Sequence, residues 1–191
     1  GGYGKIYLIC NIKTGNYYVA KTNKPTNEHV DILNEINILI HVQHPTIIRF
    51  HGYSTVNLKG QNKTTFIMDY KENGSLLDLI EKEQRSLLDP KFDNTNRQII
   101  LIGIAYGMVI LHKNDIIHRD LKPSNVLLDE FFRPYISDFG LSKFFDSYNS
   151  SDQSICNCGT KYYMAPEVID SFTYNRKADV YSFGILMYEV V

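Results

Sequence analysis

One polar string, HRDLKPSNVLLDEFFRPYISDFG at residues 118–140, constrains this chain more than any other feature. It places two carboxylates, a lysine and an amide in a loop between an expected helix and short strands: Asp120, Asp138, Lys122 and Asn125. An amide and a carboxylate are suitable oxygen ligands for Mg²⁺, another carboxylate can accept a hydroxyl proton, and a lysine can neutralise a transferring phosphate. A polar loop with caps and turns would explain any one of these residues, but the ordered set favours a phosphoryl-transfer site.

The first part of the chain reads as strands with one helix. Segments rich in Tyr, Ile and Val, bounded by turn residues, predict strands at residues 3–9, 17–21, 47–54 and 64–69. A helical spacing of three and four begins after Pro25 and predicts one apolar face with Glu35 beside it. The members of that face are Ile32, Ile36, Leu39 and Ile40.

The second part is mainly helical. A turn at residues 72–76 precedes a short helix, and Asp93 or Asn94 is expected to cap a long helix that runs to about Lys113. The last segment, DVYSFGILMYEVV, is apolar nearly all round, which predicts a buried helix. We therefore expect an α+β fold with a small β-rich part, residues 1–70, and a larger helical part, residues 71–191.

Composition excludes several classes of protein. The 191 residues carry a formal net charge of −1, so no broad attraction to nucleic acid or an anionic membrane is expected. The longest apolar run, residues 99–111, is shorter than the roughly 20 residues that a membrane span requires, and its Gly103 and Gly107 predict close packing in a core. Three cysteines are an odd, sparse set that fits a reducing compartment, and we expect a cytoplasmic location.

Five motifs in one order make the sequence resemble the eukaryotic protein kinase family over essentially all of its length. HRDLKPSN resembles the catalytic loop, DFG at 138–140 the metal-binding signature, and APE at 165–167 the end of the activation segment. Upstream, YYVAK supplies Lys21, and NEINILIHVQHPTIIRFHGY supplies Glu35 on the following helix. The resemblance implies a bilobal fold, with an N-lobe at 1–70 and a C-lobe at 71–191.

The resemblance also implies roles for the charged residues, with ATP and Mg²⁺ as cofactors. Asp120 would orient or deprotonate the substrate hydroxyl, and Lys122 would steady the γ-phosphate. Lys21 would hold the α- and β-phosphates and pair with Glu35. The implied Mg²⁺ ligands are Asn125 and Asp138.

The same resemblance places an adenine pocket between the lobes. Met68 would be the gatekeeper beside it, with Asp69, Tyr70 and Lys71 as the hinge, while Ile6, Ala20 and Leu127 would sandwich the ring. Plain core packing is the competing interpretation for these apolar residues. A stacked spine would be formed by Leu39, Phe50, His118 and Phe139, which makes His118 a packed histidine rather than a base.

The N-terminal string GGYGKIY is ambiguous by itself, because any tight turn can use glycine. The resemblance favours a phosphate-binding loop, in which Gly1, Gly2 and Gly4 let backbone amides approach ATP and Tyr3 lies at the tip. Gly1 and Gly4 match the second and third glycines of the G-x-G-x-x-G pattern. The first glycine and its strand do not precede them here.

Two positions bear on the substrate. Lys122, two residues after Asp120, and Thr160 in GTKYYMAPE follow the pattern of Ser/Thr kinases, while ENGSL and DVYSFG resemble the tyrosine-kinase-like branch. We expect a Ser/Thr kinase of that branch that acts on protein substrates in intracellular signalling. Dual specificity stays open.

The loop at 142–160 is a candidate regulatory segment. In the family, an arginine such as Arg119 often meets a phosphate there, and a bidentate contact orders the loop. An upstream kinase is therefore an expected partner, with a merely solvated loop as the alternative. The candidate acceptors are Ser147, Tyr148, Ser150, Ser151 and Ser154.

Two alternatives and one expectation about the termini complete the interpretation. A catalytically inactive kinase-like scaffold would usually have lost the lysine or a carboxylate that is present here, and a P-loop NTPase would need G-x-x-x-x-G-K-[ST], which is absent. The resemblance implies a domain incomplete at both ends, with Glu167 lacking its arginine partner. We therefore expect marginal stability for these 191 residues alone.

Overall fold

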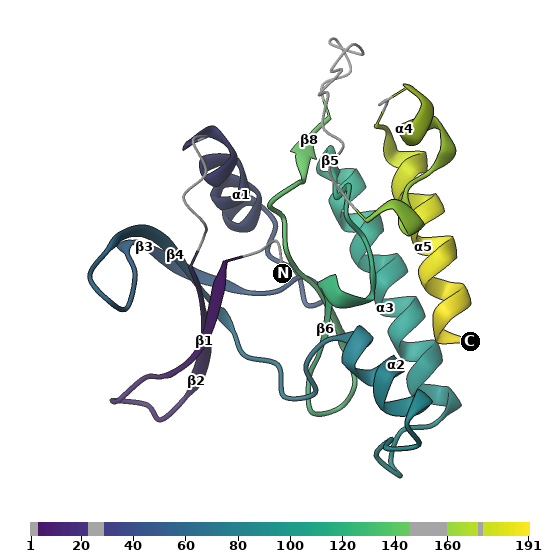
Figure 1. Cartoon of the computed structure of the whole chain (residues 1–191), viewed down its shortest axis with the longest axis horizontal. Coiled ribbons are helices and arrows are strands. Elements are labelled where there is room, and N and C mark those ends of the chain that lie inside the picture. Colours follow the sequence, from purple (N-terminus) through teal and green to yellow (C-terminus); the bar gives the residue numbers. More distant parts are fainter. Residues whose placement is uncertain (1–3, 23–28, 146–159, 172–173) are drawn as a thin grey trace.

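The computed structural model describes residues 4–22, 29–145, 160–171 and 174–191, and these form an antiparallel sheet joined to a mainly helical region (Figure 1). The sheet has four strands in the order β1-β2-β4-β3, and helix α1 connects β2 to β3. The bounds of these elements are β1 Lys5–Cys10, β2 Tyr17–Thr22, α1 His29–His41, β3 Phe50–Val56 and β4 Asn62–Asp69.

The hairpin between β1 and β2 follows from its sequence. Asn11 accepts hydrogen bonds from the backbone N–H groups of Lys13 and Thr14 through its side-chain Oδ1, at 2.9 and 3.3 Å. Gly15 then takes a φ of +74°, which glycine adopts without steric cost. The resulting antiparallel register pairs Ile6 with Lys21, so β1 and β2 lie side by side at one edge of the sheet.

Helix α1 confirms most of the predicted apolar face. Ile36 and Leu39 are buried, but Ile40 is 55% exposed, and Ile38 is fully buried in its place. The prediction was wrong at residue 40 because the buried stripe runs through positions 35, 36, 38, 39 and 42, and residue 40 lies on its far side.

The helical region begins at Ser75, which caps α2 (Leu76–Gln84) in a reciprocal capping box with Asp78. Asp93 caps the long helix α3 (Asn94–Lys113) with Asn96, so the predicted cap and helix end are both confirmed. The remaining elements are β5 Ile116–Ile117, η1 Pro123–Asn125, β6 Val126–Leu128, β7 Pro134–Ile136, β8 Lys143–Phe144, η2 Lys161–Tyr163, α4 Pro166–Ser171 and α5 Arg176–Val190.

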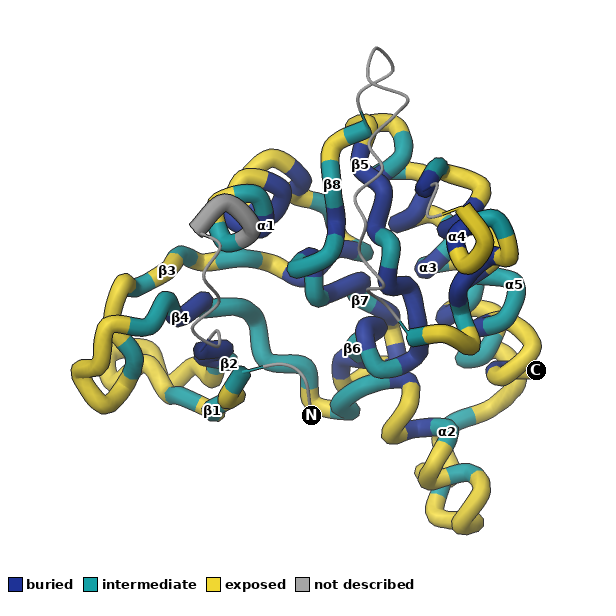
Figure 2. The backbone as a smooth tube through the Cα atoms, turned by 45° about the horizontal axis from the view of Figure 1, so that its top comes forward, coloured by how far each residue is buried: buried dark blue, intermediate teal, exposed yellow. Residues whose placement is uncertain are grey.

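The segment between α1 and β3 joins the two regions. The backbone N–H of Ile48 donates to the carbonyl of Ile136 at 2.9 Å, and the N–H of Ile136 donates to the carbonyl of Thr46 at 2.8 Å. These bonds pair the segment with β7, so β3 begins at Phe50 rather than at residue 47 as predicted. Figure 2 shows buried backbone concentrated where β5, β6 and β7 meet α3, which places the main core beside this connection.

Helix α5 is buried on one side only. Ala178, Ser182 and Leu186 face the core, whereas Val180 is 61% and Tyr188 is 86% exposed. The prediction of a helix buried all round was therefore wrong for the chain described. In Figure 1, α5 runs beside α3 at the edge of the molecule, and no further element covers its outer face among the residues described.

Helix α3 is likewise a core helix with one open side. Ile100, Ile104 and Leu111 are fully buried, while Ile102 is 69% exposed. In the part of the chain that the structure describes, no helix combines the length and apolar character that a membrane crossing needs.

Gly103 generates a stability prediction. A Cβ built there would lie 2.4 Å from Cγ of Pro134 on β7, so alanine would force α3 away from the strand. We expect Gly103→Ala to lower the free energy of unfolding by about 1–3 kcal/mol through overpacking, despite alanine's better helix propensity. Urea denaturation followed by circular dichroism measures the change.

Gly184→Ala is the matched control, because Gly184 lies within α5 and a Cβ there has nothing within 4 Å. It should raise the free energy of unfolding by about 0.5–1 kcal/mol. Stabilisation by both alanines would contradict the packing argument.

Candidate active site

Lys21 forms the first charged cluster of the site. Its Nζ lies 2.6 Å from Oδ1 of Asp138 and 3.4 Å from Oε1 of Glu35. Strand β2, helix α1 and the segment after β7 each supply one of these three residues, so the contact joins elements that are far apart in sequence. The structure thus brings Lys21 and Glu35 together, as the sequence predicts.

The cluster keeps Lys21 cationic. Burial alone would lower the pKa of Lys21, but the charges and hydrogen bonds of Glu35 and Asp138 outweigh it and raise the pKa above its usual value of 10.5. Lys21 is 9% and Glu35 5% exposed. A buried ammonium whose charged form is favoured in this way, at the end of a segment reaching the Asp138 carboxylate, is suited to contacting a polyphosphate.

The second cluster surrounds Asp120, which is 4% exposed. Its Oδ2 accepts a hydrogen bond from Nζ of Lys122 at 2.6 Å and from Nδ2 of Asn125 at 2.9 Å. Lys122 also donates to Oγ1 of Thr160 at 2.9 Å. Two side chains of the HRDLKPSN motif therefore hold the Asp120 carboxylate, and Lys122 links it to Thr160 in the later GTKYYMAPE segment.

The carboxylate of Asp179 on α5 binds the backbone of the loop that carries Asp120. It is 1% exposed, and it accepts the backbone N–H of His118 through Oδ2 and that of Arg119 through Oδ1, both at 2.9 Å. His112 on α3 lies 2.8 Å from Oδ2. Sequence reasoning did not identify Asp179 as a site residue. The available signal was an acidic residue at the start of an apolar helix, because an aspartate is rarely buried without partners.

Two residues of the site have left-handed backbone conformations. Arg119 has a φ of +68° and Asp138 a φ of +64°. Such non-glycine residues cost about 1–3 kcal/mol and persist where the surroundings hold them, often at functional sites. Here the holding contacts are the Asp179 hydrogen bond to Arg119 and the Lys21 ion pair to Asp138.

A cavity of about 220 Å³ lies beside both clusters. Its apolar walls come from β1, β2 and β4 on one side and from β6 on the other, and Lys21, Asn125 and Asp138 line its polar end. The full lining is Ile6, Val19, Lys21, Ile48, Met68, Asp69, Ser124, Asn125, Leu127, Ser137 and Asp138. An apolar pocket that ends in a few convergent polar groups is the usual form of a small-molecule site.

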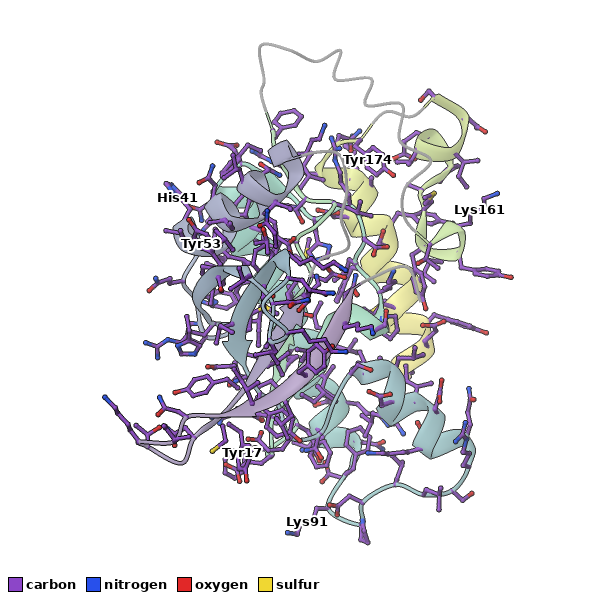
Figure 3. The ribbon with its side chains drawn as sticks, turned by 60° about the vertical axis from the view of Figure 1, so that its left-hand side comes forward. Tyr17, His41, Tyr53, Lys91, Lys161 and Tyr174 are labelled. Carbon is purple, nitrogen blue, oxygen red and sulfur yellow. The ribbon has the colours of Figure 1, made fainter. Side chains whose placement is uncertain are left out.

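The lining of the cavity differs from the expected set at Ala20. Ala20 does not line it; Ala20 is fully buried, and Val19 lines the cavity instead. Side chains alternate along a strand, so Val19 shares the face of Lys21 while Ala20 points to the opposite face. Tyr70 lines a separate outer hollow and packs edge-on against Tyr17, which is labelled in Figure 3.

The other expected pocket residues divide into two groups. Ile6, Met68, Asp69 and Leu127 line the cavity as expected. Gly1, Gly2 and Tyr3 lie outside the described residues, and Gly4 immediately precedes β1 without lining the cavity. The candidate acceptors between 147 and 154 also lie outside the described residues.

The arrangement of Asn125 and Asp138 fits a magnesium ion. Nδ2 of Asn125 donates to Asp120, so the candidate ligand atom is its Oδ1, which lies 3.5 Å from the Ser124 hydroxyl. Oδ1 of Asp138 binds Lys21, so Oδ2 is the candidate ligand atom of Asp138. Mg²⁺ is usually held by one or two protein oxygens together with water and substrate phosphates. Two oxygens at the polar end of the cavity are consistent with that coordination.

His118 is a packed residue, as expected. It is fully buried, its ring lies 5.3 Å from that of Phe139, and Nε2 lies 3.2 Å from the carbonyl oxygen of Ser137. Arg119 lies with its guanidinium 4.7 Å from the ring centre of Tyr174, just before α5. Figure 3 labels Tyr174 and the exposed Lys161, which lies on the outer side of the segment that follows Thr160.

A sheet and a helical region that enclose an apolar cavity, with lysines, carboxylates and an amide at its end, define an α+β protein suited to phosphate chemistry. Comparison with known families agrees, because the protein kinase domain matches residues 1–191. The chain belongs to the protein kinase domain family, and it has the fold of that domain.

Similar proteins come from several organisms. The chain is 35% identical over 198 residues to "cAMP-dependent protein kinase type 3" of Saccharomyces cerevisiae, covering all of this chain and 46% of that protein. It is 34% identical over 196 residues to "Cold-responsive protein kinase 1" of Arabidopsis thaliana, with 100% and 49% covered. It is 34% identical over 199 residues to human "Ribosomal protein S6 kinase alpha-2", with 100% and 25% covered.

These relatives limit what the comparison shows. The chain spans half or less of the length of these curated relatives. They are kinases of several branches, so membership of the tyrosine-kinase-like branch stays a prediction.

Asp179 generates the second stability prediction. Replacement with Asn would keep the size but put an N–H₂ group against one of the backbone N–H donors at His118 or Arg119. We expect Asp179→Asn to lower the free energy of unfolding by about 2–4 kcal/mol, because hydrogen bonds to a buried charged acceptor are lost. Chemical denaturation measures it.

Asp170→Asn is the control, since Asp170 is an exposed carboxylate on α4. It should change stability by no more than about 0.5 kcal/mol. Equal, small effects of the two substitutions would show that Asp179 does not anchor the loop.

Proposed function

We propose that this chain is the catalytic part of an ATP- and Mg²⁺-dependent protein kinase that transfers the γ-phosphate to Ser and Thr hydroxyls of protein substrates. The observation that carries the proposal is the meeting of Lys122, Asn125 and Thr160 around Asp120, next to a cavity lined by Asp138 and Lys21. Family membership supports the general activity, and this geometry supports the proposed roles.

Asp120 is the group that receives the hydroxyl proton. Lys122 and Asn125 fix the orientation of its carboxylate from two directions, at 2.6 and 2.9 Å, so one side of the carboxylate is held while the substrate approaches the other. Lys122 also stabilises the negative charge that develops on the transferring phosphate.

Lys21 is the group that holds the α- and β-phosphates. Its pairing with Glu35 and Asp138 keeps it charged and aimed along the polar end of the cavity, whose apolar walls suit an adenine ring. Mg²⁺, when bound through Asn125 and Asp138, would neutralise phosphate charge. Positioning and electrostatics of this kind supply most of the rate enhancement in phosphoryl transfer.

Preference for Ser and Thr is supported by the Lys122–Thr160 hydrogen bond, which joins the catalytic loop to the segment that precedes α4. That segment is held in place from α5, because Ser182 donates to the carbonyl of Tyr163 at 2.7 Å and the Tyr163 hydroxyl donates to Glu189 at 2.7 Å.

The wider context is part of the same proposal. We place the N-lobe at residues 1–70 and the C-lobe at 71–191, the protein in the tyrosine-kinase-like branch, and its action in cytoplasmic signalling. Phosphorylation of the 142–160 loop by an upstream kinase would regulate the activity, with Arg119 binding the phosphate. The motifs support these points, and the proposed boundary at residue 70 immediately follows Asp69, the last residue of β4.

The test is transfer of labelled phosphate from ATP, with Mg²⁺, to peptide pools that have a single Ser, Thr or Tyr acceptor. We expect labelling of the Ser and Thr pools, its loss on chelation of the metal, and a fall in kcat of about 10²–10⁴-fold for Asp120→Asn. Lys21→Met should reduce transfer comparably, because the phosphates lose their fixed cation.

Asp170→Asn is the control and should leave transfer unchanged, because its carboxylate is exposed and distant in sequence from both clusters. Equal signals from the wild type, Asp120→Asn and Lys21→Met would contradict catalysis and favour the inactive kinase-like scaffold. Labelling of the Tyr pool alone would contradict the Ser/Thr assignment.

A further inference from the structure

Ser142 is a buried polar residue whose three polar groups bond within its own turn and to two other segments. It is 1% exposed, and it follows Asp138 by four positions. Its N–H donates to the carbonyl of Phe139 at 3.0 Å, its Oγ donates to the carbonyl of His118 at 3.0 Å, and its own carbonyl accepts from Nδ2 of Asn34 at 2.6 Å. Such complete satisfaction at a buried position specifies one arrangement of the surrounding elements.

The Asn34 bond holds helix α1 against the segment that follows Asp138. Asn34 immediately precedes Glu35, so the two side chains leave adjacent positions of the same helix. Glu35 approaches the same segment closely, since a Cβ built on Gly140 would lie 3.6 Å from Oε2 of Glu35. Two neighbouring residues of α1 therefore contact one short stretch of chain.

Glu35 needs such a tether. Lys21 is 2.6 Å from Asp138 but 3.4 Å from Glu35, so the closer partner holds the ammonium and the contact with Glu35 is the looser one. Whether Glu35 reaches Lys21 thus depends on where α1 lies. A second contact, between the rings of His41 at the end of α1 (Figure 3) and Phe144 on β8, lies at 6.3 Å between exposed side chains.

The other side of Ser142 leads to the catalytic loop. His118, which accepts from Ser142 Oγ, lies two residues before Asp120, and its ring packs on Phe139. A displacement of α1 that breaks the Asn34 bond therefore acts on the segment whose side chains support His118. Two hydrogen bonds, from Asn34 to Ser142 and from Ser142 to His118, therefore connect α1 to the loop that bears Asp120.

We propose that Asn34 and Ser142 are positioning residues that couple the placement of Glu35 to the placement of the loop bearing Asp120. The inference rests on the proposed kinase function. The ion pair of Lys21 with Glu35 and the oriented carboxylate of Asp120 are then assembled together, and the loss of one weakens the other. Neither Asn34 nor Ser142 lines the cavity, so both act through other residues.

Kinetics of the full chain test the coupling. Asn34→Ala should lower kcat about 10-fold while changing the KM for ATP about two-fold or less, because one hydrogen bond is lost and the cavity walls are untouched. Asn34→Asp, which keeps the shape but sets a carboxylate oxygen against the Ser142 carbonyl, should do the same. Ser142→Ala should give a similar loss.

Two comparisons separate positioning from stability. Asn37→Ala is the matched control, an exposed asparagine on the same helix, and it should leave kcat unchanged. In a Glu35→Gln background, Asn34→Ala should cost clearly less than its 10-fold loss in the wild type, because the two substitutions disturb the same coupled arrangement. An additive loss in that background would overturn the inference.

Hydrogen–deuterium exchange gives a readout that does not require activity. Asn34→Ala should speed amide exchange about 10-fold in α1 and also in residues 117–122, whereas a purely local role would affect α1 alone. Exchange confined to α1, or a wild-type kcat in both Asn34 variants, would overturn the coupling while Asp120→Asn still tested the kinase function. A wild type no more active than Asp120→Asn would refute the function, and the exchange pattern would still decide the coupling.

Discussion

The buried carboxylate of Asp179 is the interaction on which the rest of the site depends. It is 1% exposed, and its two oxygens accept from the backbone N–H groups of His118 and Arg119, while His112 lies against Oδ2, the oxygen that accepts from His118. A carboxylate removed from water is stable only when it is hydrogen-bonded on several sides. Because α5 carries it into the core, the catalytic loop is fixed to the most buried part of the helical region, and Arg119 is held at a positive φ.

The charges above this anchor are balanced locally. Lys21 is placed between Asp138 and Glu35, and Lys122 lies against Asp120, so each buried cation has a carboxylate within 2.6 Å. Pairing limits the desolvation cost of charges that must be in place before a highly charged substrate arrives. It also leaves specific atoms uncommitted at the end of the cavity, which is the arrangement that electrostatic catalysis requires.

Local patterns predicted much of the fold, and the family resemblance supplied the candidate site residues. The caps at Ser75 and Asp93 follow from the sequence, and the ordered motifs locate Lys21 and Asp120. Two expectations differ from the structure. Strand alternation gives the cavity face to Val19 and not to Ala20, and the apolar segment of α5 is buried on one face only. Asp179 was missed because nothing in its own segment reveals which distant donors it will meet.

The catalytic loop is thus supported from two directions of different stiffness. From α5 it is held by charged hydrogen bonds to a fully buried acceptor, which break only with the core. From α1 it is reached through Ser142 and one bond from a half-buried asparagine, on a helix that connects to the loop through few contacts. Regions of low local stability are those from which moving elements are drawn, so changes in activity should enter through α1 rather than α5.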